Sequence, residues 1–148
     1  VRLHAAYKNM RTFEDLRWRD RCPHAKIDPG IVNIRKLIEK NRLVVHTYDS
    51  TGILETLSLN IPTMFFWRGG LNHLLPSAKP YYELLMDAGI LFFSSEETAK
   101  SIALHWDDIG GWWNSKKVQD ARQKFCKQYA RTVARPAREL KKILVENL

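Results

Sequence analysis

A short polar turn carries the clearest candidate chemistry in this sequence. It reads HTYDST over residues 46–51, follows an apolar run and is followed directly by Gly52. Free backbone N–H groups at a helix start, together with nearby hydroxyls, bind phosphates, and a glycine lets the backbone approach such a ligand closely. The candidate phosphate-binding residues are therefore Thr47, Ser50, Thr51 and Gly52. Helix capping by Ser50 or Thr51, which needs no ligand, is the alternative.

Two further side chains extend this candidate site. Glu55 lies about one helical turn beyond Thr51, where its carboxylate could accept hydrogen bonds from a ribose hydroxyl pair or simply face solvent near a helix start. His46 is a candidate general base or phosphate donor, although a lone histidine is also an ordinary polar residue. Asp49 is unfavourable beside a phosphate unless it caps the helix or pairs with a cation.

The sequence around the turn predicts an α/β fold. Apolar runs at 43–45, 63–67 and 90–93 are typical of buried parallel strands, and residues 1–6 form another candidate strand. Helical patterns lie between and after these runs, at 31–40, 53–59, 81–88, 94–106, from Ser115 and from Pro136. This alternation predicts a Rossmann-like three-layer domain with a mostly parallel sheet of four or five strands and C-terminal helices packed alongside. Ligands bind beyond the carboxyl ends of such strands, where the 46–51 turn falls.

Composition narrows the class of protein. With 148 residues and 45% hydrophobic residues, the chain is expected to form one domain over residues 1–148. No apolar run is long enough to cross a bilayer, there is no secretory signal, and two distant cysteines predict reduced thiols in a cytoplasmic protein without a metal site. We find no P-loop, nucleophile elbow or zinc spacing. Because the chain opens on Val1 rather than Met, we expect a fragment of a longer protein.

The charge distribution indicates anionic partners. The formal net charge of +8 fits nucleotide phosphates, nucleic acid or an acidic membrane without choosing among them. Lys and Arg recur between residues 116 and 142, as expected for a solvated helix surface or for contact with an acidic membrane. The Trp112–Trp113 pair suits stacking on a sugar or base, or packing at a helix junction.

Beyond these patterns, the chain resembles a known family. The segments that carry the resemblance are TYDSTGILETLSLNIPTMFFW (47–67), SAKPYYELLMDAGILF (77–92) and WDDIGGWWNSKKVQDARQKFCKQYA (106–130). They are similar to the C-terminal part of transferases encoded among surface-polysaccharide (O-antigen type) biosynthesis genes. That family in turn resembles GT-B glycosyltransferases, in which two Rossmann-like halves enclose the active site and the C-terminal half holds the nucleotide-sugar donor.

The resemblance implies roles for individual residues. The family's T-x-x-x-E-x-L segment matches Thr51, Glu55 and Leu57, which implies that Ser50 and Thr51 meet the donor pyrophosphate and Glu55 the ribose. Lys79, in the matching SAKPY stretch, is a candidate phosphate contact.

The sequence departs from the family pattern in two places. Asp49 and Gly52 stand where the family more often has Asn and Thr. In the loop over residues 67–75 the usual arginine is missing, and Arg68 or His73 is a candidate replacement.

The combined prediction is the donor-binding domain of a glycosyltransferase in surface-polysaccharide biosynthesis. No cofactor is expected besides the nucleotide-sugar donor, and the acceptor site is expected in a missing N-terminal domain, so the fragment alone should be inactive. The protein is expected in the cytoplasm, with possible peripheral contact at an acidic inner membrane face and no specific nucleic acid. A sugar-nucleotide 2-epimerase-like domain and a non-enzymatic basic module that binds polyanions or acidic membrane are the alternatives.

Overall fold

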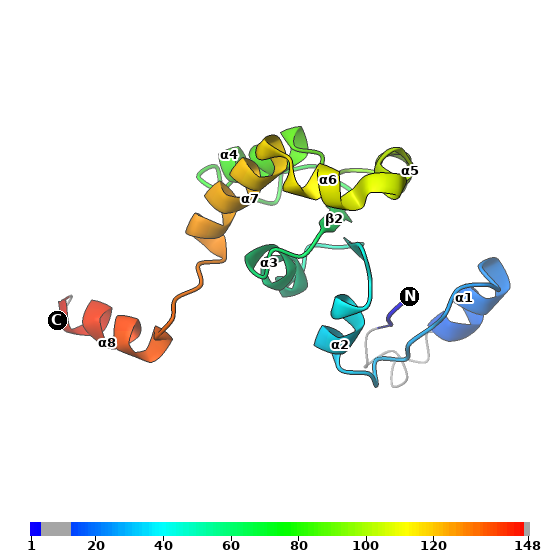
Figure 1. Cartoon of the computed structure of the whole chain (residues 1–148), viewed down its shortest axis with the longest axis horizontal. Coiled ribbons are helices and arrows are strands. Elements are labelled where there is room, and N and C mark those ends of the chain that lie inside the picture. The colour runs from blue at the N-terminus through cyan, green and yellow to red at the C-terminus, as the bar shows by residue number, and fades with distance from the viewer. Residues whose placement is uncertain (4–12, 147–148) are drawn as a thin grey trace. The chain divides into compact units, whose positions relative to one another are not determined.

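The computed structural model describes residues 1–3 and 13–146 (Figure 1). The chain divides into two compact units, Val1–Asn41 and Arg42–Leu148. The predicted single domain over residues 1–148 stays a prediction. The described parallel sheet lies wholly in the second unit, and so does every predicted site residue.

The first unit contains two short helices, α1 (Glu14–Arg21) and α2 (Ile34–Glu39). Arg2 forms an isolated parallel bridge with Asp28, and its guanidinium contacts the Asp28 carboxylate at 2.7 Å. The strand predicted at residues 1–6 is therefore not part of the sheet over residues 1–3, and residues 4–6 lie outside the described residues. In the sequence, helix α1 lies between the bridge residues Arg2 and Asp28.

The second unit alternates strands and helices before ending in helices alone. Its order is β1 (Val44–His46), α3 (Thr51–Ser58), β2 (Thr63–Phe66), α4 (Lys79–Asp87), β3 (Leu91–Phe92), α5 (Ser95–His105), η2 (Trp106–Asp108), α6 (Ile109–Asn114), α7 (Lys116–Tyr129) and α8 (Pro136–Glu146). None of the helices in the described part of the chain is long and apolar enough to span a membrane.

The sheet has the strand order β1-β2-β3, and both pairings are parallel. Val44 is in register with Thr63, and Phe65 with Leu91. The predicted α/β class and parallel pairing are confirmed. The expected four or five strands of a Rossmann-like sheet are not: the described residues contribute three, because the N-terminal segment pairs within the first unit instead.

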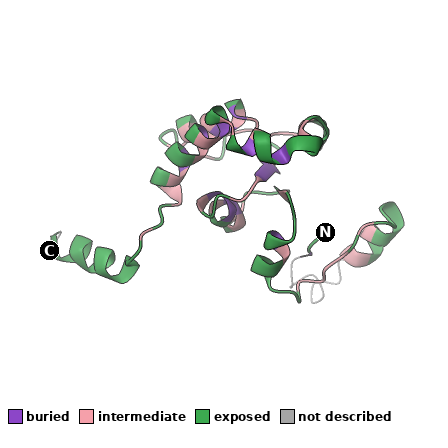
Figure 2. Ribbon diagram, viewed as in Figure 1, coloured by how far each residue is buried: buried purple, intermediate pink, exposed green. Residues whose placement is uncertain are grey.

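The core forms around the central strand and α7. Thr63, Met64 and Phe65 of β2 are fully buried, as expected for a strand with a neighbour on each side and helices packed against it (Figure 2). Helix α7 packs against both α3 and α4. Its Phe125 is fully buried and meets the Tyr82 ring edge to face, with 5.0 Å between centroids.

The C-terminal end of α3 is held by contacts from α6 and α7. Asn60, two residues beyond the end of α3, adopts a left-handed backbone with φ 56°, as is common after a helix. The indole N–H of Trp113 donates to the Asn60 backbone oxygen at 3.2 Å, and Arg122 donates to the Leu57 carbonyl at 3.0 Å. These bonds satisfy carbonyls at and just beyond the helix end and fix the axis of α3.

Replacement of Phe125 by Ala tests the role of α7 in the core. We expect Phe125→Ala to lower the free energy of unfolding by about 3–5 kcal/mol, since it removes a fully buried ring. Urea denaturation followed by tryptophan fluorescence measures the change. The neighbouring exposed Lys124→Ala should stay within about 0.5 kcal/mol, and equal midpoints for the two variants would contradict this account.

Candidate functional site

The predicted site residues lie around one edge of the sheet. Strands β1, β2 and β3 end at His46, Phe66 and Phe92, and a helix follows each of them. Because the strands are parallel, all three connections leave the same edge. This carboxyl edge is where ligands bind in open parallel sheets, so the structure gives the β1–α3 turn the position that the sequence predicted for it.

Two serines with the same backbone geometry behave differently at this edge. Ser94 precedes α5 with φ −140° and ψ 151°, and its hydroxyl accepts a hydrogen bond from the Glu97 N–H at 3.1 Å. Ser50 precedes α3 with φ −146° and ψ 157°, yet its hydroxyl makes no capping bond in the described structure. Ser94 therefore caps α5, whereas Ser50 does not cap α3 and its hydroxyl is left available.

His46 is held against the first turns of α3. Its Nε2 lies 3.2 Å from the Thr56 hydroxyl oxygen, and that hydroxyl is within 3.1 Å of the Gly52 and Ile53 carbonyls. Because the hydroxyl proton goes to a carbonyl, the network assigns the imidazole proton to Nε2 and leaves Nδ1 as an acceptor. Burial lowers the pKa of His46, so the ring is neutral at neutral pH.

The imidazole of His46 packs closely against Gly52. A Cβ atom at position 52 would lie 3.0 Å from His46 Cε1, closer than side chains normally approach. The absence of a side chain thus has a structural reason within the chain itself: it lets the ring pack against the start of α3.

Asp49 pairs with a residue from the next loop. Its carboxylate oxygen lies 3.3 Å from His73 Nε2, and both side chains are partly exposed. The edge of the Trp67 ring meets His73 at 5.5 Å between centroids. The Asp49 carboxylate, which is unfavourable beside a phosphate, therefore has a cationic partner whenever His73 is protonated. No local spacing pointed to this pair, because the two residues lie 24 positions apart.

Tyr82 is a second residue that sequence reasoning missed. Burial, with smaller contributions from the Asp49 carboxylate and Tyr129, raises the pKa of Tyr82 to about 12. Its ring packs edge to face on Trp67 at 5.8 Å between centroids. Its hydroxyl therefore stays protonated at neutral pH.

The other predicted site residues are largely exposed. Thr47 and Thr51 are exposed, Glu55 is exposed on α3, Arg68 is exposed just after β2, and Lys79 is the half-exposed first residue of α4. Arg68 lies near enough to Glu96 to contribute to its electrostatics. The pKa of Glu96 is lowered mainly by a hydrogen bond from its own backbone N–H and then by one from the Ser95 hydroxyl, and to a smaller extent by the charge of Arg68. Across the described residues, no hydrogen bond or ion pair joins the side chains of Glu55, Arg68 or Lys79 to the turn.

The structure also bears on the Trp112–Trp113 pair and on possible metal ligands. Trp113 is 2% exposed and bonds to Asn60, so it packs a helix junction, whereas Trp112 stacks on His105 at 5.4 Å between centroids. Residues 1–3 and 13–146 contain no group of three or more His, Cys, Asp or Glu side chains that could hold a metal ion.

Comparison with known proteins places the chain in a family. A family model described as LIC12162 family transferase matches residues 1–144. The chain belongs to this transferase family. A search of curated proteins gave no match, and a search of solved structures gave none either. The predicted transferase membership is confirmed at this level, while the GT-B, O-antigen and nucleotide-sugar parts stay predictions.

The two N-cap serines of this transferase give a matched test of capping. Ser94→Ala removes a hydrogen bond to a helix N–H and should lower the free energy of unfolding by about 1 kcal/mol. Ser50→Ala removes no such bond and should cost less than about 0.5 kcal/mol. Urea denaturation of both variants measures the difference, and an equal loss for both would show that Ser50 caps α3 in solution.

His46 should make stability depend on pH. Because its pKa in the folded chain lies below the ordinary value of 6.5, acidification protonates the unfolded chain first. The His46 contribution to stability is thus fully present above pH 6.5 and is lost as the pH falls toward the folded pKa. His46→Asn should flatten this part of the stability profile, measured by urea denaturation between about pH 5 and about pH 7.5.

An exposed histidine serves as the control for this experiment. His24→Asn, in the first unit, should leave the slope of stability against pH over the same interval unchanged. A His46→Asn profile parallel to that of the unmodified chain would contradict the burial of a neutral imidazole.

Proposed function

We propose that this chain is the donor-binding domain of a GT-B-type glycosyltransferase that acts in surface-polysaccharide biosynthesis. One observation carries the proposal: in a member of a transferase family, α3 begins beyond a parallel strand with an N-cap hydroxyl that no capping bond uses. The ligand that such an edge suits is the diphosphate of a nucleotide sugar.

The backbone at the start of α3 favours an anion. Ile53 N–H bonds to the Ser50 carbonyl at 3.1 Å, whereas in the described structure the N–H groups of Thr51 and Gly52 have no protein acceptor. The positive end of the helix dipole adds roughly half an elementary charge at the same place. Two N–H donors and the Ser50 hydroxyl are therefore available to phosphate oxygens.

The side chains around the turn divide into two groups under this proposal. Thr47, Ser50 and Thr51 bind the diphosphate, with Arg68 and Lys79 supplying positive charge from the next connection. Glu55, exposed one turn further along α3, receives the ribose hydroxyls.

The protonation state of His46 limits which hydrogen bonds its imidazole can make to a ligand. A neutral imidazole whose Nε2–H is held by Thr56 offers only Nδ1, an acceptor, to a ligand. This favours the general-base interpretation, or acceptance of a hydrogen bond from a sugar hydroxyl, over donation to phosphate.

The chemistry required of such a domain is positioning and neutralisation of charge. As the sugar transfers, negative charge develops on the leaving diphosphate, and fixed N–H donors and basic side chains stabilise it. The proposal assigns the acceptor site to the N-terminal half of a longer cytoplasmic enzyme, so the chain alone is expected to bind donor without turning it over.

Nucleotide titration tests the proposed function. We expect UDP, GDP or CMP derivatives to shift the backbone amide resonances of Thr51, Gly52 and Glu55 in the isotope-labelled chain. Ser50→Ala should weaken this binding roughly tenfold or more, since it removes a hydrogen bond to a charged group. Ser94→Ala, which affects a helix cap at the same edge, should leave it within about twofold.

Two results would contradict the proposal. One is the absence of shifts at α3 with every nucleotide. The other is an equal response to inorganic phosphate and to nucleoside diphosphates, which would reduce the site to a general anion site without ribose recognition at Glu55.

A further inference from the structure

The C-terminal helix α8 differs from the other helices in what it exposes. Every residue over 136–146 is exposed, and Leu140 and Leu144, one turn apart, are 58% and 56% exposed (Figure 2). Ala137 and Ile143 fall on the same side of the helix at i, i+3 and i+4 spacing. An apolar stripe therefore runs along the exposed helix.

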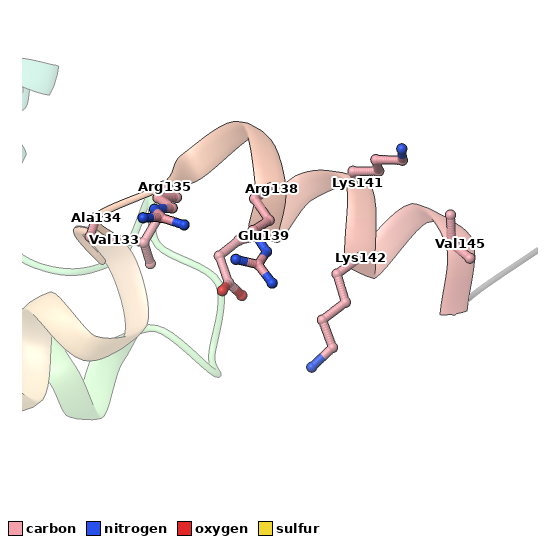
Figure 3. Close-up of a pocket in the computed structure, with 8 residues that line it drawn as sticks. All are labelled: Val133, Ala134, Arg135, Arg138, Glu139, Lys141, Lys142 and Val145. Carbon is pink, nitrogen blue, oxygen red and sulfur yellow. The ribbon is translucent and has the colours of Figure 1, made fainter.

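Basic side chains also project from this helix. Figure 3 shows side chains that line a pocket beside α8, among them Arg135, Arg138, Lys141 and Lys142, with Lys141 and Lys142 extending in different directions. Two carboxylates share the segment, Glu139 and Glu146, and Glu146 lies 3.7 Å from the Lys142 ammonium. Basic groups outnumber acidic ones, so the segment remains positively charged.

Comparison with α7 shows that this exposure is not a general property of basic helices in the chain. Helix α7 also carries several lysines, but its apolar residues Val118 and Phe125 are 2% and 0% exposed. Its basic residues are therefore a solvated surface over a buried face. In α8 the apolar and the basic residues are exposed together.

We propose that α8 is an interfacial helix that lies on an anionic lipid bilayer. Its apolar stripe would enter the boundary between headgroups and acyl chains, and Arg138, Lys141 and Lys142 would contact lipid phosphates. With 11 residues the helix is about 16 Å long, roughly half of a hydrocarbon core, so it lies in the plane of the membrane.

The charge of the segment favours this occupant over two others. A second copy of the chain would bring one basic helix against another, and the like charges would repel. A nucleic acid would use the charges but leave Leu140 and Leu144 without a partner. An acidic bilayer satisfies both the charge and the apolar stripe, and this proposal does not depend on nucleotide binding.

Vesicle co-sedimentation of the full 148-residue chain tests the proposal. We expect binding to vesicles of equal parts phosphatidylglycerol and phosphatidylcholine, and little binding to pure phosphatidylcholine. Lys141→Gln together with Lys142→Gln should lower the partition coefficient roughly thirtyfold, since each basic residue contributes about fivefold. Leu140→Gln together with Leu144→Gln should lower it at least about tenfold.

Matched charge removal on α7 provides the control. Lys124→Gln together with Lys127→Gln removes the same charge from an exposed face without an apolar stripe, and should change partitioning by less than about threefold. All variants should keep the circular dichroism and nucleotide response of the unmodified chain, because the substituted side chains are exposed.

Three results would overturn the proposal. The first is equal losses for the α7 and α8 lysine variants, which would indicate attraction by net charge alone. The second is strong binding to a single-stranded oligonucleotide that is insensitive to the two leucine substitutions, with no vesicle binding. The third is a dimer by light scattering that Leu140→Gln and Leu144→Gln dissociate, again with no vesicle binding.

Discussion

The packing of α7 on α3 and α4 is the constraint on which the rest of the second unit depends. A three-stranded parallel sheet is small and buries little apolar surface by itself. Helix α7 supplies the missing cover through Phe125, Val118 and Ala121, which are almost completely buried. The fully buried Leu57 of α3 and Leu85 of α4 belong to the same cluster. The crossover helices therefore hold their positions because a later segment of the chain covers them.

The geometry of the candidate site follows from this packing. Arg122 of α7 and Trp113 of α6 bond to the backbone at the end of α3 and fix that end. Its opposite end, with Ser50 and two free N–H groups, is consequently held at the carboxyl edge of the sheet. Thr56 of α3 orients His46 at the end of β1. The contact between Asp49 and His73 joins the β1–α3 and β2–α4 connections at that edge. The core therefore places the elements that carry these polar groups.

The two basic helices show how burial changes the meaning of a similar composition. In α7 the apolar face is buried, and the lysines are an ordinary solvated surface. In α8 the leucines and lysines are exposed together, which is the condition for an interfacial helix. The sequence predicted basic helices in both places and left open whether either contacts a membrane. Only the exposure of Leu140 and Leu144 separates them.

The sequence by itself determined the local elements, because their signals lie between residues close in the chain. Apolar runs located β1, β2 and β3 to within about two residues, the Ser94 cap marked α5, and Asn60 ended α3. Only the tertiary structure decided the number of strands, since Arg2 pairs with Asp28 and not with the sheet. It also decided that Ser50 leaves α3 uncapped, that Asp49 meets His73, and that Gly52 makes room for His46. These outcomes depend on which segments the packed core brings together, and no local spacing encodes that.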